Sequence, residues 1–301
     1  MKSAIVLTAH GTVENLDDLA PFISKIRRGH PAPGEVVAEV RRRYEAIGGQ
    51  SPLLAASRAL AEKVEARTKI RTVIAMRLWH PFPDEVVADL AESGTTHIAV
   101  VPLAQFSAKI YGDAISAAAA DIDPRIVVRC TDNWGLDEGL VTAQAKRVQN
   151  AIDAIAPEAR KNTRIIFSAH SLPKFIVDNG DSYEKDFRHS VDAIVAKLRI
   201  DAPPHVVCFQ SQGMSAPGER KVEWLGPDLQ TTLDEIKANG GSHAIFAPVG
   251  FLADHVEILF DLDLEASTWA AARGLTTSRI ESLNASDDFA DVIASLAAPL
   301  L

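Results

Sequence analysis

Only two cysteines, Cys130 and Cys208, occur among the 301 residues. They do not form a CxxC pair, so one chain cannot supply a four-cysteine zinc or iron–sulfur site, and a disulfide framework is excluded as well. No window approaches the roughly 18 apolar residues that a membrane-spanning helix requires. The first apolar run is short and ends at His10 and Gly11, unlike a secretory signal peptide. We therefore expect a cytoplasmic protein, with a peripheral membrane contact still open.

Positive charge is also scarce, because 31 Lys and Arg residues face 40 Asp and Glu residues and leave a net charge of −9. Nucleic-acid-binding proteins carry basic faces that neutralise phosphates, so nucleic acid is not an expected partner. The hydrophobic fraction of 47% is typical of a globular protein. At roughly 150 residues per domain, the length predicts two domains, each able to bury a core.

Phosphate-binding and hydrolase motifs are absent too. Neither G-x-G-x-x-G nor a P-loop occurs, and no G-x-S-x-G marks a hydrolase. The pair Gly48 and Gly49 precedes Ser51 and Pro52. This pattern predicts a turn and then a helix, with Ser51 as the N-cap and Pro52 in the first helical position. We expect no nucleotide site there.

Short β-branched runs alternate with helical patterns along the chain. The predicted strands are residues 3–9, 72–78, 97–103, 125–130, 164–169, 205–210 and 243–249. The predicted helices include residues 51–67, 84–93, 137–155 and 191–198. Because the strands are apolar almost throughout, they should be covered on both faces, as in parallel sheets of an α/β fold. The polar segment 157–162 is the expected boundary between domains 1–156 and 157–301, with the last helix able to pack back on the first domain.

Two histidines occupy matching positions in the two halves of the chain. Residues 3–12, SAIVLTAHGT, and residues 164–173, RIIFSAHSLP, each run from apolar residues through Ala-His into a turn. Residues 100–108 and 246–254 likewise share an apolar strand, a proline and a loop that carries phenylalanine. These echoes suggest that the halves are distant copies of one α/β unit.

His170 is the stronger candidate of the two histidines. At the carboxyl end of a strand, its small neighbours Ser168 and Ala169 leave its imidazole room to face a cleft, where α/β folds bind ligands. The alternative is a structural histidine hydrogen-bonded at the strand end. His10 has only its symmetry with His170 in support of a functional role.

The stretch FLADHVEILFDLDLEA, residues 251–266, is rich in acids and contains no lysine. On a regular helix, Glu257, Asp261 and Glu265 would form one line of carboxylates at spacings of four residues. Such a line is either a solvated acidic face or a relay that gathers a divalent cation. His255 precedes Glu257 by two residues, so it either orients the loop or marks a locally irregular helix. Nitrogen from His170 and oxygen from Glu257 would suit Fe²⁺, Zn²⁺ or Co²⁺.

Arginines gather around a Pro/Gly-rich loop between residues 26 and 53, at positions 27, 28, 41, 42 and 43. Arginine forks bind carboxylates in bidentate fashion, which suggests a ligand that bears carboxylates. The alternative, a solvated basic helix face, suits Arg41 and Arg42 better than Arg27, which lies beside a glycine turn.

Six blocks in order resemble the ferrochelatases, class II chelatases that insert Fe²⁺ into a porphyrin in haem synthesis. They are RYEAIGGQSPL (43–53), MRLWHPF (76–82), FSAHSLP (167–173), WLGPD (224–228), PVGFLADHVEILFDLDLEA (248–266) and ESLN (281–284). The blocks cover nearly the whole chain, and the third and fifth are highly specific.

The resemblance implies two Rossmann-like domains, each a parallel sheet with helices on both faces, related by pseudo-twofold duplication across a porphyrin cleft. It implies that His170 and Glu257 are catalytic and that they bind the metal together with Asp261 and Glu265. The porphyrin-binding positions it implies are His10, Arg27, Arg43, Ser51, Arg77 and Phe251.

The resemblance also implies a lyase that takes Fe²⁺ as a substrate, binds no cofactor tightly and carries no iron–sulfur cluster. A monomer is expected, with a porphyrin as substrate and a haem-type product. The IRRGxP…RYEAIGG run is most similar to bacterial enzymes that use coproporphyrin III, although those enzymes have tyrosine where this chain has His10. Protoporphyrin IX stays open as the substrate. The alternatives are a cobalt chelatase acting on sirohydrochlorin and a non-catalytic haem or porphyrin carrier.

Overall fold

The computed structural model describes residues 2–213 and 222–301. These residues form two compact units, the first comprising Met1–Trp134 and Leu283–Leu301 and the second Gly135–Ser282. The division falls earlier than the polar segment near residue 157, because α6 (Glu138–Asp153) packs with α9 (Tyr183–Ala196) in the second unit. The segment 157–162 is therefore an internal connection of that unit. The last helix, α13 (Asp287–Ala297), packs on α3 (Leu53–Thr68) in the first unit.

The first unit is built on a parallel sheet with strand order β2-β1-β3-β4. Its strands are β1 (Ser3–Ala9), β2 (Thr72–Met76), β3 (His97–Pro102) and β4 (Val127–Cys130). Its other elements are η1 (Leu16–Asp18), α1 (Leu19–Ile26), α2 (Gly34–Ala46), α3, α4 (Pro83–Glu92), α5 (Ala108–Ile122), α13 and η3 (Ala298–Leu300). Val6 and Val100 pack with Val87 of α4 and Ile115 of α5 in one core. Side chains alternate along a strand, so the equally buried Leu7 faces the other side of the sheet.

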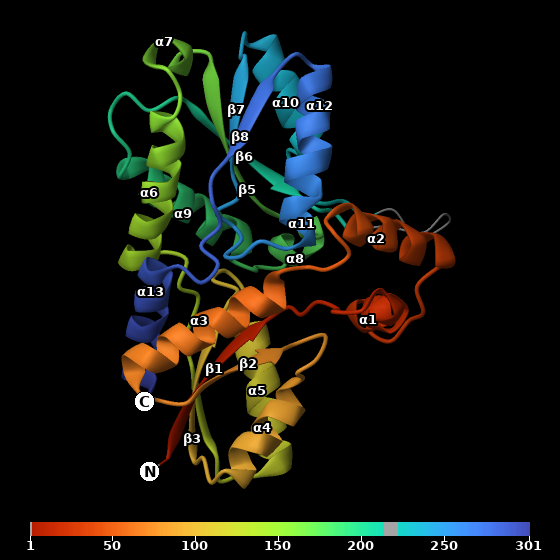
Figure 1. Ribbon diagram of the computed structural model, residues 1–301, viewed down its shortest axis with the longest axis vertical. Coiled ribbons are helices and arrows are strands. Elements are labelled where there is room, and N and C mark those ends of the chain that lie inside the picture. The colour runs from red at the N-terminus through yellow and green to blue at the C-terminus, as the bar shows by residue number, and fades with distance from the viewer. Residues whose placement is uncertain (1, 214–221) are drawn as a thin grey trace. The chain divides into compact units, whose positions relative to one another are not determined.

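The second unit repeats this arrangement with strand order β6-β5-β7-β8, again parallel. Its strands are β5 (Thr163–His170), β6 (His205–Gln210), β7 (His243–Ala247) and β8 (Thr276–Arg279). Its helices are α6, α7 (Pro157–Arg160), α8 (Lys174–Asp178), α9, α10 (Leu229–Ala238), α11 (Val256–Leu259), the π-helix η2 (Asp261–Ala266) and α12 (Ser267–Ala272). Figure 1 shows α6 and α9 on one side of this sheet and α10 and α12 on the other.

The identical strand order in the two units confirms the predicted duplicated α/β fold. In each unit the first strand lies inside the sheet, between the second and the third strands of that unit. The second strand of each unit is therefore added on one side of the first strand, β1 or β5, and the third strand on its other side. Open α/β sheets bind ligands outside the carboxyl ends of strands at such switch points. His10 follows β1 directly and His170 ends β5, so each histidine lies at a switch point.

Several element ends differ from the predictions for physical reasons. Strand β7 stops at Ala247, because Pro248 has no N–H to donate to a neighbouring strand. Helix α3 begins at Leu53 with Pro52 as its N-cap, so the predicted N-cap role of Ser51 is wrong by one residue. The Ser51 hydroxyl still accepts a long hydrogen bond, 3.4 Å, from the Leu53 amide. The short strand β8 was not predicted, since TTSR lacks an apolar run.

No helix among the described residues is long and apolar enough to cross a bilayer.

We expect Gly250→Ala to destabilise the second unit. Gly250 follows β7, and its amide donates to the Ser168 carbonyl of β5 over 3.0 Å. A Cβ at this position would overlap Ala169, including its backbone. Overpacking of this kind typically costs about 1–3 kcal/mol, measured here as the free energy of unfolding in urea. Gly34→Ala is the control, because an added Cβ there meets nothing within 4 Å. Equal stability of the two variants would contradict the close approach.

Candidate active site

His170 is the last residue of β5, where the buried apolar run of that strand ends. Its Nδ1 lies 2.5 Å from the Ser171 carbonyl oxygen. A carbonyl only accepts, so Nδ1 carries the proton, and in the neutral imidazole Nε2 is left with its lone pair. That Nε2 lies 3.5 Å from Oε1 of Glu257, and both side chains are about one-third exposed (34% and 32%). The pair is therefore accessible to a ligand.

A second imidazole faces the same carboxylate from the other oxygen. His255 Nε2 lies 3.6 Å from Glu257 Oε2, while His255 Nδ1 lies 2.9 Å from the Ala253 carbonyl. The backbone of His255 is extended (φ −160°, ψ −177°), and the residue precedes α11 as its N-cap. His255 can therefore reach Glu257, two residues later, because it is not helical. Of the two alternatives for this pair, a residue that orients the loop agrees with the bond from His255 to Ala253, and an irregular helix is found further along, at Asp261–Ala266.

The three groups shift one another's proton affinities. Burial disfavours the charged form of His170 and by itself would lower the pKa of this residue. The adjacent Glu257 carboxylate outweighs this effect by attracting the positive charge, so the pKa of His170 is raised. The same balance of burial and Glu257 raises the pKa of His255. Burial alone would raise the pKa of Glu257, but the two imidazoles hold it well below its usual value. Each imidazole therefore holds its proton more tightly than a free histidine does, and the carboxylate between them favours its ionised form.

The acidic segment, residues 256–266, does not form one regular helix. Helix α11 ends at Leu259, and residues Asp261–Ala266 are π-helical, with the Glu265 amide donating to the Phe260 carbonyl over 2.9 Å. The predicted line of carboxylates at α-helical spacing is therefore wrong in its geometry. Asp261 is only 5% exposed, and its Oδ2 accepts a 2.5 Å hydrogen bond from the Ser211 hydroxyl. It does not belong to a solvated acidic face, while Glu265 is half-buried.

Within the described part of the chain, no three His, Cys, Asp or Glu side chains converge closely enough to hold a metal ion. His170 and Glu257 together offer one nitrogen and one oxygen ligand. Structural metal sites close the coordination shell with protein ligands, whereas reactive sites leave positions open. Two ligands of mixed hardness suit a divalent transition metal that is passed on rather than stored.

Phe251 lies in the same unit, on the loop that follows β7. Its ring centroid is 5.2 Å from that of His255, and it packs against the core formed with Ile258 and Leu262. A half-buried aromatic ring beside the imidazole pair can contact a flat apolar ligand.

In the first unit, His10 lies beside a cluster of aromatic rings. His10 is exposed just after β1, and its ring lies 6.5 Å from Phe22, which in turn lies 5.8 Å from Trp79. Trp79 also packs edge-on against Phe82 at 6.2 Å. Sequence reasoning did not single out Phe22 or Trp79, although Trp79 belongs to the MRLWHPF block.

The predicted porphyrin-binding arginines differ in their surroundings. Arg43 Nε donates to Glu39 Oε1 over 2.8 Å, and Arg42 binds the same carboxylate through two nitrogens. Arg42 and Arg43 together lower the pKa of Glu39 to about 2. The pairing of Arg43 with Glu39 could have been predicted from the sequence, because the two residues are four positions apart on one helix.

The remaining predicted positions are placed by other contacts. The Arg77 guanidinium lies over the Tyr111 ring, 5.7 Å from its centroid. Ser51 is 3% exposed, so its reach toward a ligand is restricted. Arg27 is half-buried at the end of α1.

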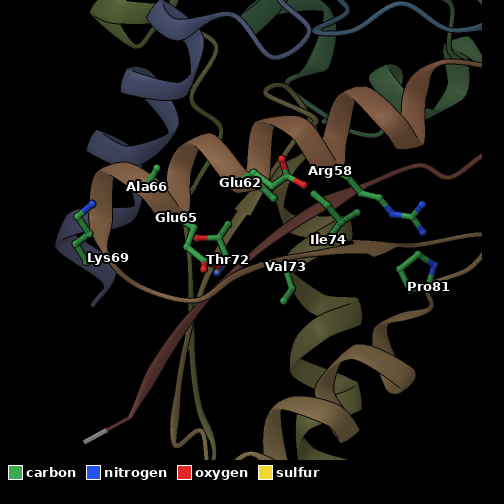
Figure 2. Close-up of a pocket in the computed structure, with 10 residues that line it drawn as sticks. Arg58, Glu62, Glu65, Ala66, Lys69, Thr72, Val73, Ile74 and Pro81 are labelled. Carbon is green, nitrogen blue, oxygen red and sulfur yellow. Dashed lines mark hydrogen bonds between the residues drawn. The ribbon is translucent and has the colours of Figure 1, made fainter.

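A groove of about 700 Å³ runs between α3 and β2 of the first unit, and none of the predicted site residues lines it. Figure 2 shows Glu62 and Glu65 of α3 beside Thr72 and Ile74 of β2. Glu65 Oε2 accepts from the Thr72 amide over 2.8 Å, so this acid is used to join helix and strand. The candidate chemistry lies instead at the switch-point histidines.

The chain is similar to ferrochelatases throughout its length. A family model described as Ferrochelatase matches residues 2–299. The ferrochelatase of Herpetosiphon aurantiacus is 29% identical, with 97% of each chain covered. The coproporphyrin III ferrochelatase of Anoxybacillus flavithermus is 30% identical, with 97% of this chain and 94% of the relative covered. In fold, the chain is similar to SirB from Bacillus subtilis with Fe³⁺, at a TM-score of 0.61 and 16% identity over 99% of this chain and 96% of that one.

We expect Glu257→Gln to lower the pKa of His170. In the folded protein Glu257 raises that pKa above its ordinary value of 6.5. The attraction therefore contributes its full stability below pH 6.5 and loses it as the pH rises through the raised pKa. An NMR titration of the His170 ring protons should show the midpoint move to lower pH in the variant.

Glu265→Gln is the matched control for this titration, because it removes a carboxylate from the same segment eight residues further along. The His170 midpoint should stay where it is in the wild type. An unchanged midpoint in Glu257→Gln would refute the electrostatic coupling.

Proposed function

The chain belongs to the ferrochelatase family, and we propose that it inserts Fe²⁺ into coproporphyrin III as an enzyme of haem biosynthesis. The observation that carries this proposal is the His170–Glu257 pair at the switch point of the second sheet, 3.5 Å apart and open to a ligand. Support for coproporphyrin III comes from the relative in Anoxybacillus flavithermus that bears this substrate's name.

Metal insertion exchanges two pyrrole N–H protons for one dication. A base must accept those protons, and a general base needs a lone pair aimed at the proton that it removes. His170 meets this requirement through Nε2, since its Nδ1 proton is committed to the Ser171 carbonyl. Glu257 stabilises the imidazolium that forms, because its carboxylate lies against the same nitrogen. Release of this proton to water resets the pair, which then accepts the second pyrrole proton and releases it in the same way.

Fe²⁺ is a substrate in this scheme, and the acidic segment is its route to the pair. The partly exposed Glu265 meets the ion first, the buried Asp261 follows, and Glu257 with His170 forms the last stage. Carboxylates attract a dication without forming a closed shell, which allows onward transfer.

Porphyrin binding supplies the remaining requirement, which is access to nitrogens hidden in a planar ring. An enzyme can bind the macrocycle in a bent form and offset the strain with contacts remote from the reacting nitrogens. We assign the contact with the ring to Phe251, which lies beside His255 in the same unit as His170 and Glu257. Coproporphyrin III carries four propionates, so it can engage more arginines than a porphyrin with two.

We expect the purified protein to form the iron porphyrin fastest from coproporphyrin III. The assay mixes protein and Fe²⁺ anaerobically with coproporphyrin III, protoporphyrin IX or sirohydrochlorin, and repeats each with Co²⁺. Formation of the metallated product is followed by its absorption spectrum against a reaction without enzyme. Fastest turnover of sirohydrochlorin with Co²⁺ would indicate a cobalt chelatase, and binding without turnover would indicate a carrier.

His170→Ala should abolish insertion while porphyrin binding is retained. The substitution removes the proposed base at a partly exposed position, so the core stays intact. Activity should fall by at least 100-fold, within the range that general acid–base catalysis contributes. Porphyrin binding is measured by fluorescence quenching. His80→Ala is the control, since His80 is an exposed histidine paired with Glu85 in the first unit. Near-normal turnover of His170→Ala would remove this residue from the mechanism.

A further inference from the structure

Gln210 is the last residue of β6, and Ser211 follows it directly. Each of them contacts one acid of the proposed metal route. Gln210 Nε2 donates to the Glu257 carbonyl over 2.9 Å, and the Ser211 hydroxyl donates to Asp261 Oδ2 over 2.5 Å. Neither residue was predicted as part of the site, because neither is charged. Adjacent residues of one strand end therefore connect the sheet to both acids.

Gln210 is fixed to β5 at more than one point. It pairs in register with His170, and its carbonyl accepts from the Ser171 amide over 2.7 Å. Its side-chain Oε1 accepts from the Ser168 hydroxyl over 2.7 Å. Gln210 is 2% exposed and Ser168 1% exposed, so water does not compete for these bonds.

The orientation of the Gln210 amide follows from its partners. The Glu257 carbonyl can only accept, so the NH₂ group must face it, and Oε1 must then face Ser168. The Ser168 hydroxyl can rotate to donate, and it completes the arrangement. One amide thus joins the strand that ends in His170 to the first turn of α11, which carries Glu257.

Ser211 extends the same connection to Asp261. Its backbone has φ of +58°, in the left-handed region, which directs the chain away from the sheet after β6. Burial removes the hydration of a carboxylate, and the Ser211 hydroxyl replaces one of the lost hydrogen bonds for the 5%-exposed Asp261.

We propose that Gln210 and Ser211 are positioning residues, which set the distance between His170 and Glu257 and hold Asp261 in the metal route; this inference rests on the proposed function. A base and a carboxylate that share one proton or one metal ion act only within a narrow range of separation. The hydrogen bonds of the Gln210 amide to Ser168 and to the Glu257 carbonyl fix that separation by holding the backbone of both segments. Neither Gln210 nor Ser211 needs to touch a substrate.

The decisive variant is Gln210→Met, which keeps the length of the side chain and removes both of its hydrogen bonds. We expect kcat for Fe²⁺ insertion to fall by about 10- to 100-fold, as for residues that orient metal ligands. The KM for the porphyrin should be unchanged, because no porphyrin contact is lost. A folded Gln210→Met enzyme with wild-type kcat would overturn the proposal.

Gln144→Met is the matched control for loss of stability. Gln144 is also 2% exposed in the second unit, and its Nε2 donates over 2.9 Å to the carbonyl of Val249. We expect this variant to lower the melting temperature, though by less than Gln210→Met because only one side-chain hydrogen bond is lost, and to retain its kcat. A parallel fall of kcat in both variants would mean that stability alone limits activity, which also overturns the proposal.

Two milder variants keep the test decisive if Gln210→Met does not fold. Ser168→Ala removes the bond that orients the amide and should lower kcat, whereas Ser190→Ala should not, since the buried Ser190 hydroxyl has no hydrogen-bond partner in the described structure. Ser211→Gly relieves the positive φ and removes the CH₂OH side chain with its hydrogen bond to Asp261, so it should raise the KM for Fe²⁺. Wild-type kinetics in both Ser168→Ala and Ser211→Gly would contradict the inference.

Wild-type activity separates this inference from the proposed function. If the wild-type protein forms no metalloporphyrin, the proposed function fails before any variant is compared. If the wild type is active and the variants match it, only the positioning role fails.

Discussion

The Glu257 carboxylate lies between two imidazoles, and the surrounding structure is arranged to keep it there. Each histidine donates its Nδ1 proton to a nearby backbone carbonyl, which directs its Nε2 at the carboxylate. Since a carbonyl cannot donate, this orientation does not depend on pH. Protonation of each imidazole therefore changes at Nε2, the nitrogen that faces Glu257. Under the proposed function, this is the nitrogen of His170 that accepts a pyrrole proton.

Two separate segments must be held together for this interaction to exist, the end of β5 and the start of α11. His170 is the last residue of a central strand. His255 has an extended backbone just before a short helix, and Glu257 lies in the first turn of that helix. The parallel sheet brings them together because its strands end at one edge. Further along, Arg279 of β8 binds Asp263 of the π-helix with two nitrogens and Asp254 at 3.2 Å, which ties the loop and the acidic segment to the sheet.

Much of this could be predicted from local patterns, and the exceptions have identifiable causes. Apolar runs predicted the central strands. The position of His170 after such a run predicted its place at the carboxyl end of a strand. The division between the units was not predictable, because the pattern of α6 shows that one face is buried but not which sheet covers it. An irregular helix near His255 was one of two alternatives, but its position at Asp261–Ala266 was not predicted. The contact between Gln210 and Glu257 also escaped prediction, since it joins residues distant in sequence. The roles of the candidate site residues remain predictions.

The π-helix between Asp261 and Ala266 has a consequence for how this protein can vary. Its i→i−5 hydrogen bond accommodates one residue more than an α-helical turn would. Loss of one residue from this stretch would remove that extra residue and restore α-helical bonding, so the side chains within the stretch would change direction. Glu265 would then leave its present direction, whereas substitutions would keep it. The length of this segment is therefore under tighter constraint than its composition, and insertions or deletions should be tolerated elsewhere first.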